Sequence, residues 1–297
     1  MSILIVGATG LVGGEIAHKL AKHGNDVVAF VRGGRIHSKA DELLSAGIGI
    51  IEGDLTSAET LVKAVEDSEV VVCTATSMPS AANDGLRRVD HDGILALIEA
   101  AEAEGVKKFI YVSFSGNIQE DSPLKTAKRE CENRLLASRM EVVIVRPSYF
   151  MEVWLSPALG FDPAKSSVRI YGSGDAKVSY VSASNVSDFG ALAATKTYPD
   201  KKTILEIGGP EPLSQLDMIR IVEKEWKKRM KTDCVPTEAL ESLHKSSDPL
   251  QKTFAALMLA YSKGDVVVGA SSLAHQHAIK LQSVAEYASK SRDLHHG

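Results

Sequence analysis

An apolar run that breaks into three evenly spaced glycines constrains the fold of this 297-residue chain more than any other feature. Residues 3–6 predict a buried strand, and apolar residues at helical spacing resume after the glycines. Gly7 suits a sharp turn, Gly10 the close approach of a pyrophosphate, and Gly13 the close packing of helix on strand. We therefore predict a dinucleotide-binding turn with phosphates at the helix N-terminus. A glycine-rich turn without a ligand is the alternative.

An arginine stands where such a fold reads the adenosine ribose. Residues 26–32 predict a second buried strand, whose end lies about 20 residues past the last glycine. An acidic residue there favours NAD, whereas a guanidinium matches a 2′-phosphate with its planar fork of donors. Arg32 therefore predicts a preference for NADP(H), and a surface arginine on a loop is the alternative.

Strands and helices alternate five times up to Ser113. Further strands are predicted at 48–52, 69–75 and 106–113, with helices at 38–46, after Thr56 and at 86–105. This alternation indicates an α/β fold, a Rossmann-type doubly wound parallel sheet with right-handed crossovers. Such sheets bind ligands at the carboxyl ends of their strands. One edge should therefore gather Gly7, Arg32, Asp54, Thr76 and Ser113.

A cation occupies the predicted inward face of the next helix, residues 121–138. Leu124, Lys128, Cys131 and Leu135 recur at spacings of four, three and four, so they share a face. Other faces are expected to carry Lys125, Arg129, Glu132 and Arg139. Lys128 either has a polar partner inside or extends its ammonium outward past its apolar stem.

The strict alternation ends after a sixth strand at 141–146. We predict a main domain at 1–155, to whose sheet later segments return, and a smaller substrate-covering region at 156–297. Short strands are expected at 168–171, 178–181 and 203–207, and helices after Asn185 and around 250–261. Capping pairs predict helix starts at Thr56 with Glu59, Ser214 with Asp217, and Ser283 with Glu286. Residues 264–276 receive no assignment.

Composition limits the class of protein. Hydrophobic residues make up 44% and charged residues 24%, as in ordinary globular proteins. The net charge of −4 gives no electrostatic case for nucleic acid or an anionic membrane. No apolar run reaches the length of a membrane span, and no signal peptide is evident. Three widely spaced cysteines fit a reducing cytosol and no metal cluster, so a cytoplasmic location is expected.

Taken together, these features resemble the atypical short-chain dehydrogenase/reductases, and within them the NmrA-like and isoflavone-reductase-like group. The likeness covers about the first 155 residues through G-A-T-G-L-V-G, V-R, G-V-K-K-F-I-Y-V-S and R-P-S-Y-F-M-E, and continues weakly beyond. It implies that NADP(H) is bound along the sheet edge. The pyrophosphate would lie on Gly7, Thr9, Gly10, Leu11, Val12 and Gly13, and the 2′-phosphate on Arg32. Asp54 and Leu55 would flank the adenine, Thr76 the nicotinamide ribose, and Pro147, Tyr149 and Phe150 the nicotinamide end and substrate.

One departure from the family pattern concerns catalysis. The wider family uses Y-x-x-x-K, in which the tyrosine donates a proton and the lysine lowers the pKa of that tyrosine. Here Lys128 is present, but Leu124 replaces the tyrosine. Reductases of the isoflavone branch also lack this tyrosine and rely on the lysine, whereas NmrA-like regulators bind NADP(H) without catalysis. The resemblance therefore implies cofactor binding for this chain and leaves both roles open.

Two functions follow. The first is an NADPH-dependent reductase of a small apolar or aromatic carbonyl, enone or quinone, with Lys128 orienting the ribose and Ser113 hydrogen-bonding the developing oxyanion. Tyr149 is a candidate proton donor or a packing residue, and Phe150 and Trp154 line a pocket or belong to the core. The second function is a non-catalytic NADP(H)-binding regulator that signals to a protein partner.

Overall fold

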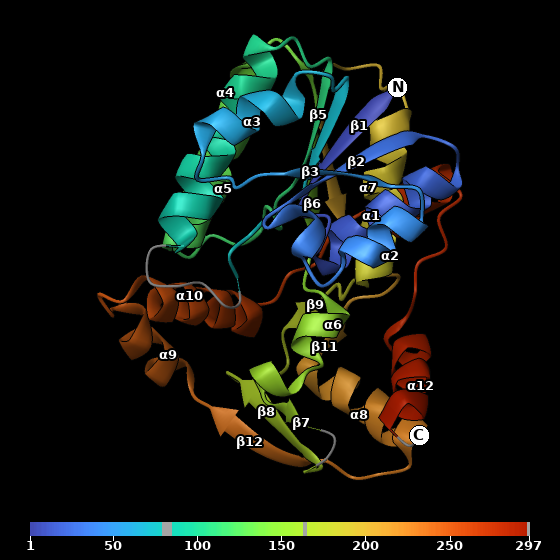
Figure 1. The fold of residues 1–297 in the computed structure, drawn as a ribbon. Coiled ribbons are helices and arrows are strands. Elements are labelled where there is room, and N and C mark those ends of the chain that lie inside the picture. Colours follow the sequence, from blue (N-terminus) through green and yellow to red (C-terminus); the bar gives the residue numbers. More distant parts are fainter. Residues whose placement is uncertain (79–84, 163–164, 296–297) are drawn as a thin grey trace. The chain divides into compact units, whose positions relative to one another are not determined.

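The computed structural model describes residues 1–78, 85–162 and 165–295, and its chain divides into two units. Figure 1 follows the chain from the blue N-terminus to the red C-terminus. The first unit contains Met1–Ser113, Pro123–Arg146 and Val186–Leu205, and the second contains Phe114–Ser122, Pro147–Asn185 and Glu206–Gly297. The chain thus first enters the second unit well before the predicted boundary at residue 155.

A seven-stranded sheet organises the fold, in the order β10-β6-β5-β4-β1-β2-β3. Its strands are β1 (Ser2–Val6), β2 (Asp26–Val31), β3 (Gly49–Glu52), β4 (Val70–Cys73), β5 (Lys108–Val112), β6 (Glu141–Pro147) and β10 (Lys202–Ile207). Neighbouring strands from β3 to β6 pair in parallel. The order reverses between β1 and β4, which is the switch point where open α/β sheets bind ligands. The doubly wound sheet that the alternation predicts is therefore present.

Helices cover both faces of this sheet in the first unit (Figure 1). One face carries α3 (Ala58–Val65), α4 (Ile94–Ala103) and α5 (Pro123–Ala137), and the other carries α1 (Leu11–Lys22) and α7 (Ala183–Thr195). The short α2 (Ala40–Ser45) follows β2. The predicted strands up to β6 have ends within two residues of those observed. Continuous apolar runs identify the strands that are buried on both faces, and the partly exposed edge strand β3 is the exception to this explanation.

The predicted capping box of Thr56 and Glu59 is wrong. Helix α3 begins at Ala58 after Ser57, with no side-chain cap. Instead, the Thr56 N–H and hydroxyl donate to Asp54 Oδ1 at 2.8 and 2.7 Å. The Asp54 carboxylate is a strong acceptor, and it holds residues 54–56 in a local turn before α3. The Thr56 hydroxyl is used in this turn and does not cap the helix.

The second unit combines small sheets with helices around an aromatic core. Its strands are β7 (Phe161–Asp162), β8 (Ser167–Tyr171), β9 (Lys177–Val178), β11 (Leu213–Ser214) and β12 (Lys231–Val235). Its helices are α6 (Met151–Trp154), α8 (Gln215–Trp226), α9 (Thr237–His244), α10 (Pro249–Lys263), α11 (Ala270–Gln276) and α12 (Val284–His295). Both capping pairs predicted in this unit form: Ser214 with Asp217 and Ser283 with Glu286 exchange backbone-to-side-chain hydrogen bonds.

Several elements differ from the sequence prediction. Helix α7 begins at Ala183 rather than after Asn185, because the Ser182 hydroxyl accepts from the Asn185 N–H and caps the helix earlier. Helices α9 and α11 and strands β7 and β12 were not predicted, and α11 lies inside the unassigned stretch 264–276. Within the described ranges, no helix combines the length and the apolar character that a membrane crossing requires.

Candidate functional site

The glycine turn after β1 has the geometry that its sequence requires. Gly7 has φ of +95°, in the left-handed region, and a Cβ there would lie 2.6 Å from Thr74 Oγ1. A Cβ on Gly13 would lie 2.3 Å from the Gly7 carbonyl oxygen. Both contacts are far too short for a real side chain, so glycine is needed for the turn and for close packing of α1 on β1.

The N-terminus of α1 leaves backbone donors available. Gly10 is the N-cap residue and has no side chain to cap the helix, and the first turn contains no acidic residue. Leu11, the first helical residue, is 51% exposed although it is apolar. Uncapped N–H groups at the positive end of a helix dipole form a cradle that suits a pyrophosphate. Thr9 and Val12 lie in the same turn.

Two cations follow β2, in the segment predicted to bind the adenosine ribose of the cofactor. Arg32 follows β2 and is exposed, and its charge helps the Thr56 N–H hydrogen bond to hold the pKa of Asp54 below its usual value despite burial. Lys39, which the sequence analysis did not single out, donates from Nζ to the Thr9 carbonyl oxygen at 2.8 Å. Its signal was its place in a basic loop, R-G-G-R-I-H-S-K, directly after β2.

A cavity of about 370 Å³ lies beside the glycine turn. Its walls come from the turn, the outer face of α1 and helix α2: Ala8, Gly10, Leu11, Gly14, Glu15, His18, Lys19, Lys39, Glu42 and Leu43. Lys39 therefore both contacts the glycine turn and lines the cavity. Arg32 is not among the lining residues.

The loop after β4 is held by a buried acid. Thr76 is exposed, and its hydroxyl accepts from the Met78 N–H at 3.2 Å. The next residue, Ser77, donates its N–H to Asp90 Oδ2 at 2.9 Å and also hydrogen-bonds this oxygen through its hydroxyl. Asp90 is fully buried, and its Oδ1 has no hydrogen-bond partner among the described residues. It lies in a π-helix, Leu86–Gly93, a type of distortion that is frequent at functional sites.

Lys128 points inward, as the spacing of α5 predicts. It is 5% exposed, and Leu124, Cys131 and Leu135 are buried on the same face. Its Nζ lies 3.5 Å from the Val112 carbonyl oxygen and 5.0 Å from the ring centroid of Tyr111. The ammonium therefore does not extend to solvent. Next to Val112, Ser113 is buried. Its hydroxyl makes no hydrogen bond of normal geometry among the described residues, but it lies close enough to Glu132 to lower the pKa of that carboxyl.

Glu132 is buried inside the first unit, whereas the helical spacing predicted that it lies away from the inward face of α5. It is buried and accepts from Arg129 Nη1 at 2.6 Å and from Arg146 Nε at 3.1 Å. Burial raises the pKa of Glu132, but hydrogen bonding with Arg146 and Ser113, together with the two arginine charges, outweighs burial and leaves that pKa below its usual value. Helical spacing did not predict that Glu132 is buried, because its partner Arg146 lies on β6 and not on the same helix.

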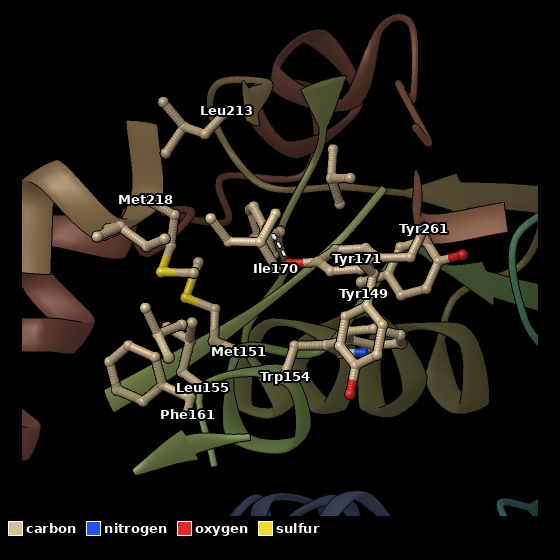
Figure 2. Packing of buried hydrophobic residues seen from close by; sticks show 14 of the residues in the cluster. Tyr149, Met151, Trp154, Leu155, Phe161, Ile170, Tyr171, Leu213, Met218 and Tyr261 are labelled. Atoms are coloured by element: carbon tan, nitrogen blue, oxygen red, sulfur yellow. Dashed lines mark hydrogen bonds between the residues drawn. The ribbon is translucent and has the colours of Figure 1, made fainter. Parts of the chain in front are cut away.

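The residues after β6 belong to the second unit. Tyr149 is 4% exposed, its ring packs edge-on against Trp154 with centroids 4.5 Å apart, and Tyr261 lies 5.1 Å away. Figure 2 shows these three rings next to one another within the buried cluster. Burial raises the pKa of Tyr149 well above its usual value, and its hydroxyl makes a long 3.4 Å hydrogen bond to the Leu257 carbonyl oxygen. Tyr149 and Trp154 are therefore core residues of this unit.

The other two residues predicted at the nicotinamide end have backbone roles. Pro147 is buried at the last position of β6, and Phe150 is half-buried and forms a parallel bridge with Val181. Leu55 packs against the core of the first unit. Ser113 and Lys128 lie in the first unit, and Tyr149 lies in the second.

Comparison with known proteins adds a family and a set of relatives. Residues 7–196 match the model of a family described as NAD(P)H-binding. The photosystem II assembly factor Ycf39 of Trieres chinensis is 30% identical over 242 residues, which cover 80% of this chain and 72% of that protein. Isoflavone reductase of Medicago sativa is 26% identical, with 89% and 88% covered.

Solved structures share the fold. NADPH-dependent quinone oxidoreductase of Escherichia coli, complexed with NADPH, superposes with a TM-score of 0.79 at 21% identity over 98% of this chain and 99% of that one. Triphenylmethane reductase of Citrobacter sp., complexed with NADP(H), gives 0.78 at 20% identity, with the same shares covered.

Proposed function

Because this chain belongs to the NAD(P)H-binding family, we propose that it is an NADPH-dependent reductase of a small apolar or aromatic carbonyl, enone or quinone. The observation that carries the proposal is Lys128, a buried ammonium to which the described residues offer one distant carbonyl oxygen and one aromatic ring. An ammonium so placed is costly without a hydrogen-bonding partner. The hydroxyls of a nicotinamide ribose would supply one.

The chain's own residues would hold the pyrophosphate and the 2′-phosphate of the dinucleotide. The uncapped N–H groups after Gly10 would bind the pyrophosphate, and the absence of Cβ atoms at Gly7 and Gly13 keeps the turn tight around them. Arg32 and Lys39 would share the 2′-phosphate, since guanidinium and ammonium groups both form charge-assisted hydrogen bonds with phosphate oxygens.

Bound NADPH supplies the hydride. Lys128 would orient the ribose and hold a proton for the reduced oxygen of the substrate, and Ser113 would donate its hydroxyl to the charge that develops there. Leu124 offers no phenol, and the buried Tyr149 with its raised pKa is a poor proton donor. The lysine is therefore the proposed acid, and water would restore its proton.

A panel of quinones and enones tests this function directly. Purified protein is incubated with NADPH and each acceptor while nicotinamide absorbance is followed. We expect acceptor-dependent oxidation that is weaker with NADH and largely lost in Lys128→Met. Tight NADPH binding with no oxidation by any acceptor would reject the reductase.

The second candidate is a non-catalytic NADP(H)-binding regulator that contacts a protein partner. Leu124 at the family's tyrosine position favours it, and several relatives are described as assembly factors rather than reductases. A regulator would bind NADPH without turnover, and NADPH and NADP⁺ would protect different segments in hydrogen exchange. A reductase would need no such difference.

A further inference from the structure

A buried carboxylate in the second unit gathers three neutral side chains. Asp265 is 2% exposed, and it lies in the stretch 264–276 that the sequence left unassigned. Its Oδ1 accepts from Ser115 Oγ and Asn117 Nδ2, both at 2.7 Å, and its Oδ2 accepts from Ser148 Oγ at 2.7 Å. Among the described residues, no Lys, Arg or His forms an ion pair with Asp265. Within the described part of the chain, hydrogen bonds are therefore what holds this carboxylate.

The backbone of Asp265 is itself fixed. Its N–H donates to the Lys177 carbonyl oxygen at 2.8 Å, and its carbonyl oxygen accepts from the Ser179 N–H at 2.9 Å. The preceding Gly264 has φ of +95°, and a Cβ there would lie 2.6 Å from the Lys177 oxygen. These contacts with β9 restrict the movement of Asp265. Its carboxylate is therefore a fixed acceptor for the three side chains that donate to it.

The three donors come from two segments that follow neighbouring strands. Ser115 and Asn117 lie in the loop after β5, and Ser148 comes directly after β6. Strands β5 and β6 pair in parallel, so both segments leave the carboxyl edge of the sheet, where α/β folds bind ligands. The Ser148 segment continues into Tyr149 and Phe150. Asp265 thus ties together two segments of the second unit, and the family resemblance assigns the second of them to the nicotinamide end and the substrate.

We propose that Asp265 is a positioning residue for the substrate, which acts by fixing the loop after β5 and the segment after β6. It would act through these two segments and not on the reacting atoms. The inference rests on the proposed reductase function for its kinetic readout. Its structural readout, the environment of Trp154, is independent of any activity.

Three variants separate geometry from charge. Asp265→Ala removes the anchor, and Ser148→Ala removes one bond and spares the rest. Asp265→Asn removes the charge but can keep the bonds, because its oxygen can replace Oδ1 and its amide can donate to a reversed Ser148 hydroxyl. Ser283→Ala is the matched control, since it loses the hydrogen bonds of a helix cap elsewhere in the same unit.

Kinetics with a quinone and NADPH give the first readout. We expect Ser148→Ala to raise the KM for the quinone about three- to tenfold, as suits one lost hydrogen bond, with NADPH affinity unchanged. Asp265→Ala should raise it further, and Asp265→Asn should restore near-normal values. If Ser148→Ala and Asp265→Ala match Ser283→Ala in KM, Asp265 is merely structural and the proposal fails.

Fluorescence gives the second readout, even for a protein that turns nothing over. The chain has two tryptophans, so Trp226→Phe leaves Trp154, which packs on Tyr149, as a single reporter. In this background we expect quenching by a quinone to weaken with Ser148→Ala and Asp265→Ala, and to recover with Asp265→Asn. Equal quenching in all variants would overturn the positioning role. Absent turnover with altered quenching would reject the reductase alone.

Discussion

Lys128 occupies an environment that does little to stabilise its charge. A carbonyl oxygen at 3.5 Å and an aromatic ring are weak compensation for the loss of water around an ammonium. The nearby acid Glu132 is already paired with two arginines. A polar ligand at Lys128 would therefore lower the free energy of the folded protein, which is the physical basis for placing a cofactor there.

Arg32 gives a prediction for cofactor choice. Arg32→Ala should lower NADP(H) affinity about ten- to a hundredfold, because it removes a charge-assisted interaction worth about 1.5–3 kcal/mol. NAD(H) affinity should change little. Titration of both cofactors measures this, with exposed Arg35→Ala as the control for general loss of positive charge. Equal losses for NADP(H) and NAD(H) would refute the assignment of Arg32 to the 2′-phosphate.

Tyr149 gives a prediction for catalysis. Tyr149→Phe should reduce turnover less than about tenfold, since the change removes one long hydrogen bond to Leu257 worth about 1 kcal/mol and leaves the ring packing intact. Steady-state kinetics with NADPH and a quinone check this. A thousandfold loss would mean that the phenol donates a proton and that its buried environment opens during the reaction.

The sequence could predict residues that belong to a local pattern, and it missed those that depend on the folded chain. The steric need for glycine at positions 7 and 13 followed from their spacing. Asp90 and Asp265, in contrast, are buried acids whose partners are 13 and more than a hundred residues away. No periodicity reveals such pairs. The ligand roles assigned to Arg32, Ser113 and Lys128 remain predictions.

At the scale of elements, patterns that use a residue's own neighbours were predicted most accurately. The capping pairs at Ser214 and Ser283 formed, whereas Thr56 was taken by the stronger acceptor Asp54. The residues 86–105 read as one helix, but the structure starts it with the π-helix Leu86–Gly93. A wider turn leaves no clear trace in apolar spacing, so the inward position of Asp90 was not predictable.

The cap at Ser283 predicts how stability changes with acid. Hydrogen bonds from Lys280 and from the Ser283 N–H lower the pKa of Glu286 from 4.5 to about 2. A carboxyl whose pKa is lowered on folding stabilises the protein above its unfolded pKa, and this contribution is lost as the pH falls from about 5 toward 2. Glu286→Gln should therefore lower the thermal midpoint at pH 7, and the difference from the wild type should shrink toward pH 2.

Thermal unfolding of both proteins across this pH range provides the measurement. The Glu286 side chain is partly exposed, so the difference should be small and should decrease with added salt. A difference that is constant with pH would show that the carboxylate charge is not what stabilises α12.

For the molecule as a whole, the resemblance noted from the sequence is confirmed. The chain belongs to the NAD(P)H-binding family, and isoflavone reductase is among its relatives. The Rossmann-type sheet is also confirmed, and the cofactor is of the class that the glycine turn indicated. Two segments belong to another unit than the residues on either side of them in the sequence. Phe114–Ser122 belongs to the second unit, and Val186–Leu205 belongs to the first. Such exchanges depend on tertiary contacts rather than on local composition.

Lys128→Met tests the central claim most directly, because it keeps most of the apolar stem and removes the charge with all three donors. NADPH affinity, turnover with a quinone and the thermal midpoint are measured on one preparation. We expect a folded protein that binds NADPH about ten- to a hundredfold more weakly and has lost most of its reductase activity. A variant that is more stable than the wild type and binds NADPH equally well would contradict the account, because the buried lysine would then serve neither the cofactor nor the reaction.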